Sequence, residues 1–252
     1  MKPGWRKQVR RRWRVLRVRM TGRPRVAITG CARSGTTYAA AVFQRLGFDV
    51  GHERLRANGI VSWCLAPDTN ERCLGPAPRE LDMLQLPYVH QVRHPLRVMA
   101  SVATLEPHSW AYIARHIPIR AEDSLRLSAM KYWFHWNKLA EERALFTYRV
   151  EAMAAALPRI LDIGDFDREA IDLAVLDQVP TTVNTRPHED PPWDAFEAED
   201  AELCRRIRAL AVRYGYVDAA GDAPRPRRFA TQRAGGEPPR GAVALRRRRG
   251  GA

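Results

Sequence analysis

A short apolar run that ends in a glycine-bracketed loop constrains the fold of this chain more than any other feature. Residues 25–29 are rich in β-branched side chains and stop at Gly30, which predicts a short buried strand. The segment Thr36–Leu46 is rich in alanine and has an apolar face, and Gly47 is a favourable residue for ending a helix. A strand, a tight loop and a helix in this order predict the first unit of an α/β domain.

The loop between this strand and helix, GCARSGTT from Gly30 to Thr37, has the layout of a phosphate-binding P-loop. Its backbone N–H groups and the helix N-terminus offer partial positive charge to a phosphate, and Gly35 allows the backbone to approach closely. Three hydroxyls can donate to the anion, those of Ser34, Thr36 and Thr37. A loop that binds a nucleoside triphosphate has lysine after its second glycine, whereas this chain has Thr36 there and carries its basic residue at Arg33.

Strands and helices alternate along the rest of the chain. Further strands are predicted at Phe48–Val50, Tyr88–Val92 and Ala144–Tyr148, and helices at 95–105, 122–143, 152–161, 167–177 and 197–213. Residues 54–86 contain several Gly and Pro, so short helices and loops that could line a substrate site are expected there. The alternation predicts an α/β, P-loop NTPase-like three-layer fold, with a central parallel sheet and helices on both faces.

A second basic motif follows the strand at Tyr88–Val92. Arg93 leaves the carboxyl end of that strand, and Ser101 lies about two turns into the next helix. Helical side chains lean toward the N-terminus, so the Ser101 hydroxyl can point back toward Arg93. Because ligands of parallel sheets bind at the carboxyl ends of the strands, the two residues could hold a second phosphate near the loop.

With both motifs, the chain resembles the sulfotransferases that use 3′-phosphoadenosine 5′-phosphosulfate (PAPS) as co-substrate. In that family a [Lys/Arg]-Ser-Gly-Thr-Thr loop binds the 5′-phosphosulfate, and an Arg with a Ser eight residues later binds the 3′-phosphate. Here Arg33–Thr37 matches the first element, and Arg93 with Ser101 has the spacing of the second. The arginine form of the loop is most similar to the tyrosylprotein and carbohydrate branches.

The resemblance also implies catalytic residues. Arg33 would stabilise charge on the oxygen that leaves with 3′,5′-ADP, and no metal is expected to take part. Tyrosylprotein sulfotransferases have a Gly-Glu-Glu segment about twenty residues beyond the loop arginine, and this chain has Gly51-His52-Glu53 there. Glu53 is the favoured general base and His52 the alternative, since a neutral imidazole can also accept a proton. A purely structural carboxylate, paired with an arginine, is the other interpretation of Glu53.

Further predictions concern the nucleotide and the acceptor. Tyr148 matches the tyrosine of a family segment near the adenine, and Arg186 lies in a segment that resembles the loop closing over the nucleotide in related bacterial members. Residues 133–136, WFHW, are expected in the core rather than in a pocket. Three aromatic residues in presumed loops are candidates for acceptor contacts, namely Trp63, His108 and Trp110.

The two ends of the chain carry its positive charge. The whole chain has a formal charge of +14, but residues 1–25 and 223–252 carry +19, so residues 26–222 carry −5. A specific nucleic-acid-binding face on the domain is therefore not expected. Residues 1–24 are expected to form either a solvated basic arm or an amphipathic helix that binds weakly to an anionic membrane surface, and a disordered tail is expected at residues 221–252. The domain is placed at residues 25–220.

The four cysteines form no CxxC pair and no finger-like set with histidine, so a zinc site is not expected. Cys31 lies inside the loop, either as a small filler or as a site of modification. No window resembles a membrane-spanning helix or a secretory signal, which predicts a cytoplasmic protein, and the Arg/Ala-rich composition suggests a bacterial one.

The sequence therefore predicts a PAPS-dependent sulfotransferase that acts on a hydroxyl of a carbohydrate, lipid or other small-molecule acceptor. A P-loop kinase for a small molecule is one alternative, opposed by the missing lysine. A non-catalytic protein that binds 3′-phosphoadenosine nucleotides, or that contacts nucleic acid or membrane through its tails, is another.

Overall fold

The computed structural model describes residues 24–167, 176, 179 and 191–216. The predictions for residues 1–23 and 217–252, for most of the helix at 167–177 and for Arg186 lie outside the described residues. Within the described part, no helix is long and apolar enough to cross a membrane.

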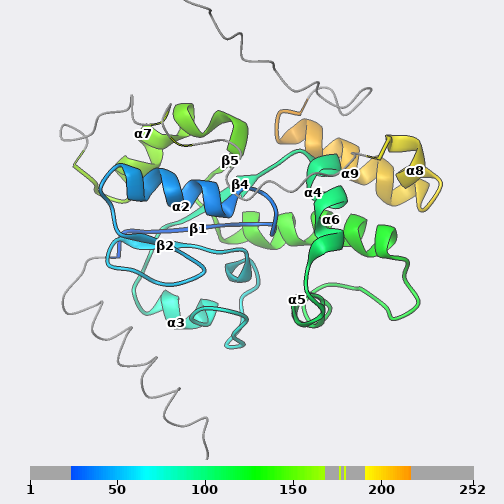
Figure 1. Cartoon of the computed structure of the whole chain (residues 1–252), viewed down its shortest axis with the longest axis horizontal. Helices are drawn as coiled ribbons and strands as arrows, with labels where there is room; N and C mark the ends of the chain where they lie inside the picture. The colour runs from blue at the N-terminus through cyan, green and yellow to red at the C-terminus, as the bar shows by residue number, and fades with distance from the viewer. Residues whose placement is uncertain (1–23, 168–175, 177–178, 180–190, 217–252) are drawn as a thin grey trace, which may run out of the picture.

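A parallel sheet forms the centre of the described part and contains five strands there (Figure 1). Its strands are β1 (Val26–Gly30), β2 (Val50–His52), β3 (Gly59–Val61), β4 (Tyr88–Val92) and β5 (Thr147–Arg149), arranged in the order β2-β3-β1-β4-β5. All four strand pairs are parallel, so the carboxyl ends of the strands meet at one edge. The central strand, β1, is fully buried and leads directly into the glycine loop.

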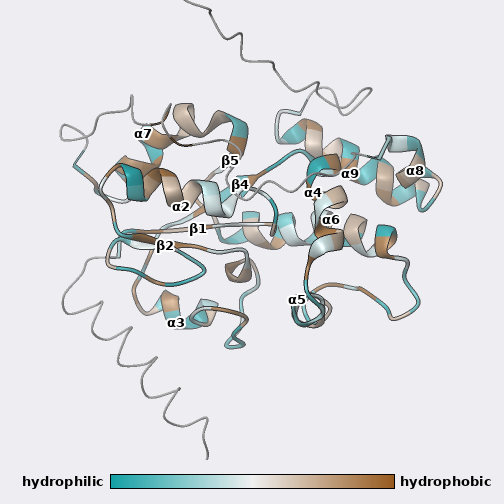
Figure 2. Ribbon diagram, in the orientation of Figure 1, coloured by the Kyte–Doolittle hydropathy of each residue, from teal (hydrophilic) through white to brown (hydrophobic). Residues whose placement is uncertain are grey.

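Helices cover both faces of this sheet. On one face, α2 (Thr36–Arg45) and α7 (Met153–Ile163) pack on alternate side chains of the strands, such as Ile28 and Val89. On the other face lie α3 (Pro78–Asp82) and the long α6 (Leu125–Arg143), which contacts β1 and β4. Apolar and polar stretches alternate along α2 and α9 in Figure 2, as expected for helices with one buried face. The predicted three-layer α/β fold is confirmed.

The remaining helices extend the layer around α6. They are α4 (Pro95–Ser101), α5 (Pro107–Ile113), α8 (Trp193–Glu197) and α9 (Ala201–Arg213), with single 3₁₀ turns at Trp63–Leu65, Val102–Thr104 and Val150–Ala152. Their core includes Trp133 and Trp136 with no exposed surface, and Phe134 is 6% exposed, so the aromatic run of α6 lies in the core as predicted.

The strand β3 was not predicted, and it decides where Glu53 lies. Residues 53–58 turn back beside β2 before the chain enters β3, and the Asn58 N–H donates to the Asp49 carbonyl at 2.9 Å. The returning backbone passes so near β2 that a Cβ on Gly51 would lie 1.9 Å from the Arg54 carbonyl oxygen. Glu53 begins this turn with φ 53°, so its side chain stands at the carboxyl edge of the sheet.

Several element boundaries differ from the prediction for local reasons. The second strand starts at Val50 rather than Phe48, because the Phe48 ring packs on Phe43 and Phe166. The long helix starts at Leu125, where the Ser124 hydroxyl accepts a hydrogen bond from the Leu127 N–H at 3.0 Å. The helix after Pro95 ends at Ser101 and continues as a 3₁₀ turn. The last helix starts at Ala201 and not at 197, which ends α8.

Candidate functional site

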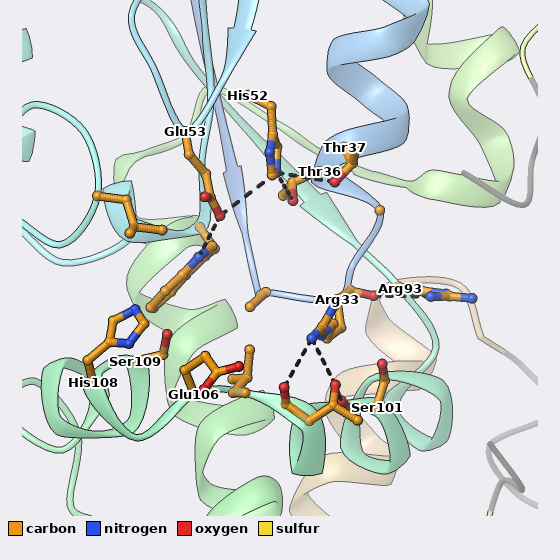
Figure 3. Close-up of a pocket in the computed structure, with 16 residues that line it drawn as sticks. Arg33, Thr36, Thr37, His52, Glu53, Arg93, Ser101, Glu106, His108 and Ser109 are labelled. Atoms are coloured by element: carbon orange, nitrogen blue, oxygen red, sulfur yellow. Dashed lines mark hydrogen bonds and ion pairs between the residues drawn. The ribbon is translucent and has the colours of Figure 1, made fainter. Parts of the chain in front are cut away.

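A cavity of about 250 Å³ opens at the carboxyl edge of the sheet, where β1, β2, β3 and β4 end (Figure 3). Its lining comes from the glycine loop, the β2–β3 turn, the 3₁₀ turn after β3, and the segment from α4 to α5. The lining residues are Ala32, Arg33, Gly35, Thr36, Thr37, His52, Glu53, Trp63, Leu74, Arg93, Ser101, Thr104, Leu105, Glu106, His108 and Ser109.

The glycine loop has two left-handed residues, Arg33 with φ 68° and Gly35 with φ 91°. The second of these needs glycine for a further reason, because a Cβ on Gly35 would lie 2.8 Å from Cγ2 of Val150. The chain then enters α2 at Thr36, and the first N–H groups of that helix have no partner within the helix. Backbone donors at a loop of this shape, together with a helix N-terminus, suit an anion.

Two side chains from the core hold the loop from behind. The Tyr132 hydroxyl, on α6, accepts a hydrogen bond from the Ala32 N–H at 2.7 Å. On the other side, the Gln91 side chain donates to the Ser34 carbonyl at 2.8 Å, and the Tyr148 hydroxyl donates to the Gln91 Oε1 at 2.5 Å. The loop is therefore fixed by contacts that leave its front open to the cavity.

Two predicted cofactor residues take part in this support and do not line the cavity. The Ser34 hydroxyl is buried and donates to the Cys31 carbonyl at 2.7 Å, so it shapes the loop instead of facing an anion. Tyr148, only 6% exposed, lies in the core beneath the loop. Cys31 is completely buried as well, in keeping with its interpretation as a filler, and burial raises the pKa of its thiol.

Both predicted arginines line the cavity, and Figure 3 draws Arg93 beside the glycine loop that carries Arg33. The Arg33 guanidinium donates through Nη2 to the Thr104 hydroxyl at 2.8 Å and to the Thr104 carbonyl at 3.3 Å. Arg93 follows β4 and donates through Nη1 to the Arg33 carbonyl at 3.1 Å. Ser101 lies at the end of α4, one 3₁₀ turn before Thr104, and lines the same cavity as Arg93.

His52 stands between the loop and Glu53. Its Nε2 lies 3.1 Å from the Thr36 hydroxyl and 3.3 Å from the Thr37 hydroxyl, within hydrogen-bond distance of both. The same nitrogen is 3.9 Å from Oε1 of Glu53. Burial lowers the pKa of His52, and the nearby Glu53 carboxylate offsets part of that effect. At neutral pH the imidazole is therefore neutral and bonded to the loop hydroxyls.

Glu53 faces the opposite part of the cavity. Its Oε1 accepts a hydrogen bond from the indole N–H of Trp63 at 3.0 Å, and no arginine pairs with it among the described residues. The carboxylate is partly accessible, with 28% of its side chain exposed. Within the described residues, the partner of Glu53 is thus the Trp63 indole and not an arginine.

The far side of the cavity, opposite the loop, is formed by residues that the sequence hardly indicated. Leu74, Leu105, Glu106 and Ser109 lie there with Trp63 and His108. Leu74 lies in the Pro/Gly-rich segment 54–86, where the sequence predicts part of a substrate site, whereas no motif marks Leu105, Glu106 or Ser109. Trp63 and His108 line the cavity but lie in a 3₁₀ turn and in α5, not in loops, and Trp110 packs against the core outside the lining.

In the part of the chain that the structure describes, no group of three His, Cys, Asp or Glu side chains could hold a metal ion. Neither the known protein-family models nor the curated proteins include a match to this chain. Among solved structures, the chain is similar to mouse sulfotransferase SULT7A1 in complex with PAP. The identity is 12%, the TM-score is 0.37, and the match covers 75% of this chain and 88% of that chain.

Proposed function

We propose that the chain is a sulfotransferase that moves the sulfuryl group of PAPS to a hydroxyl of a carbohydrate, lipid or other small-molecule acceptor. The observation that carries the proposal is the meeting of two basic motifs and one carboxylate at a single cavity. Arg33 and Arg93 enter it from the loop side, and Glu53 faces it from the β2–β3 turn. These are the residues to which the family resemblance assigns donor binding and proton transfer.

The loop side fits the anionic part of this donor. The first N–H groups of α2 and the hydroxyls of Thr36 and Thr37 would bind the phosphosulfate, and Arg93 with Ser101 would bind the 3′-phosphate. Arg33 would stabilise the charge that develops on the leaving oxygen, an effect worth a factor of roughly 10² to 10³ in such sites.

The transfer itself asks little covalent chemistry of the protein. The acceptor oxygen forms a bond to sulfur while the bond from sulfur to the bridging phosphate oxygen breaks, and that electron pair leaves with 3′,5′-ADP. The hydroxyl proton passes to Glu53. His52 is the second candidate, but its Nε2 already lies at hydrogen-bond distance from Thr36 and Thr37, which favours Glu53 as the base.

Calorimetry with 3′,5′-ADP, without magnesium, tests the donor site. We expect binding at micromolar concentration and a loss of about tenfold or more in Arg93→Ala, because a charge-assisted hydrogen bond to phosphate is removed. The matched control is Arg205→Ala, since Arg205 is an exposed arginine of α9 and lies outside the cavity. Binding of ATP with magnesium, but not of 3′,5′-ADP, would overturn the proposal in favour of a kinase.

Transfer of labelled sulfate from PAPS to a panel of sugars, lipids and small alcohols tests the reaction. Incorporation that disappears in Arg33→Ala is the expected result. Tight binding of 3′,5′-ADP with no transfer to any acceptor would instead favour a protein that only binds 3′-phosphoadenosine nucleotides.

A further inference from the structure

The indole of Trp63 is held more rigidly than a residue that merely lines a cavity needs to be. Trp63 begins the 3₁₀ turn after β3 and is 3% exposed. Its ring centroid lies 5.9 Å from that of Tyr112, with an interplanar angle of 80°. The distance to the ring centroid of Trp136 is 5.7 Å, with an angle of 45°. The indole N–H of Trp136 donates to the Trp63 carbonyl at 3.0 Å, so both the ring and the backbone of Trp63 are fixed.

This fixed ring aims its one hydrogen-bond donor at Glu53. The distance from Nε1 of Trp63 to Oε1 of Glu53 is 3.0 Å, and Figure 3 draws the bond at the cavity wall. The carboxylate is also restrained from its own side. Glu53 has a left-handed backbone, and its N–H donates to the Val61 carbonyl at 2.8 Å. Two segments that are ten residues apart thus meet in one defined geometry.

The chemistry of the pair has a direction. An indole N–H can only donate a hydrogen bond, and a carboxylate oxygen can accept one, so the contact fixes which oxygen of Glu53 faces the indole. Because Oε1 is occupied by the indole, the other oxygen, Oε2, is left for a proton. A carboxylate whose rotation is restrained in this way would meet an acceptor hydroxyl with a defined oxygen.

We infer that Trp63 is a positioning residue for proton transfer: it holds Oε1 of Glu53 so that Oε2 receives the proton of the acceptor hydroxyl. The inference rests on the proposed function, because it needs Glu53 to act as the base. It goes beyond that function in naming the residue that orients the base and the oxygen that reacts.

Trp63→Phe tests this role because it removes the N–H and keeps an aromatic ring. We expect kcat to fall about tenfold or more, the usual effect of losing a hydrogen bond to a charged group. The KM for the acceptor and the affinity for 3′,5′-ADP should stay within about twofold. In Glu53→Gln, adding Trp63→Phe should lower the residual rate no further.

The matched control is Tyr214→Phe. The Tyr214 hydroxyl donates to Oε2 of Glu141 at 3.1 Å, so the control also removes an aromatic donor from a carboxylate, outside the cavity. It should leave kcat unchanged. If Trp63→Phe fails to fold, benzothienylalanine at position 63 keeps the bicyclic shape and replaces the N–H with sulfur.

The outcomes separate the inference from the proposed function. A wild-type chain that transfers sulfate, with an unchanged kcat in Trp63→Phe, would overturn the role of Trp63 alone. An equal loss from Trp63→Phe in the wild-type and Glu53→Gln backgrounds would also overturn it, since the indole would then act through another group. A wild-type chain that sulfates no acceptor would overturn both.

Discussion

The two sides of the cavity are built in different ways. The loop side comes from one continuous motif, residues 30–37, completed by Arg93 at the end of the neighbouring strand and by Ser101. The far side is assembled from Glu53, Trp63, Leu74 and the start of α5, which lie far apart in the chain. A phosphate of fixed shape can be bound by a compact local motif, whereas the shape of an acceptor is met by side chains that only the fold brings together.

The charges of the two sides differ as well. The loop side presents Arg33, Arg93 and hydroxyls, and the far side presents the carboxylates of Glu53 and Glu106. His52 lies at the boundary, close to the hydroxyls of one side and to the carboxylate of the other. This difference predicts that the loop side governs donor binding and that Glu53 governs turnover.

The largest effect on turnover is expected from Glu53→Gln, which removes the proposed base from the far side and leaves the glycine loop unchanged. Loss of a general base should lower kcat by a factor of roughly 10² to 10⁴. The affinity for 3′,5′-ADP should remain within about twofold, because Glu53 lies opposite the loop. Steady-state kinetics together with calorimetry measures both quantities.

His52→Gln is the companion variant, because it removes the imidazole from the same boundary. If Glu53 is the base, His52→Gln should lower kcat much less than Glu53→Gln does and should change donor affinity through Thr36 and Thr37. The reverse ranking of kcat would assign the base to His52.

Much of the loop side could be predicted from the sequence, because its information is local. Gly35 marks a left-handed turn, and Arg93 with Ser101 follows from a strand end and helical spacing. The role of Ser34 could not be predicted, because its hydroxyl faces the Cys31 carbonyl instead of the cavity. The contact of Tyr148 with the loop support could not be predicted either, because its partner Gln91 is a core residue of β4.

The far side could not be predicted in the same way. The strand β3 has three residues, too few to show a period, and its burial comes from β1 and β2 on either side. Without β3, nothing in the sequence brings Trp63 to Glu53. The contact depends on a turn at Gly51–Gly59 and on aromatic packing against α6, both of which are tertiary.

The next largest effect concerns the stability of the core beneath the cavity at low pH. Unfolding at low pH limits the pH range in which variants of the two sides can be compared. His90 of β4 is fully buried, and its ring nitrogens lie 3.0 Å from the Thr147 hydroxyl and 3.1 Å from Oδ1 of Asn137. Burial lowers its pKa from 6.5 to about 4, partly offset by the hydrogen bond to Asn137. His90 of the unfolded chain therefore becomes protonated below pH 6.5, whereas His90 of the folded chain stays neutral until about pH 4.

The free energy of unfolding should accordingly fall as the pH drops from 6.5 to 4, by on the order of 3 kcal/mol from this group alone. Urea unfolding at pH 7 and pH 4.5 measures the loss, and His90→Gln should show a smaller one. Equal losses in the two proteins would mean that the acid sensitivity of the fold arises elsewhere. The kinetics of the cavity variants should therefore be compared above the pH at which this unfolding begins.

The smallest effect is expected at Thr104, where the two sides meet. The Arg33 guanidinium donates to the Thr104 hydroxyl at 2.8 Å, and a phosphate group at the loop would draw on the same N–H groups. Thr104→Val removes this competitor but keeps the carbonyl contact at 3.3 Å, so 3′,5′-ADP should bind about threefold more tightly, the range of one net hydrogen bond. Weaker binding would instead show that Thr104 aims Arg33 at the anion, and the cavity would then have to be treated as one coupled unit, not as two sides that act separately.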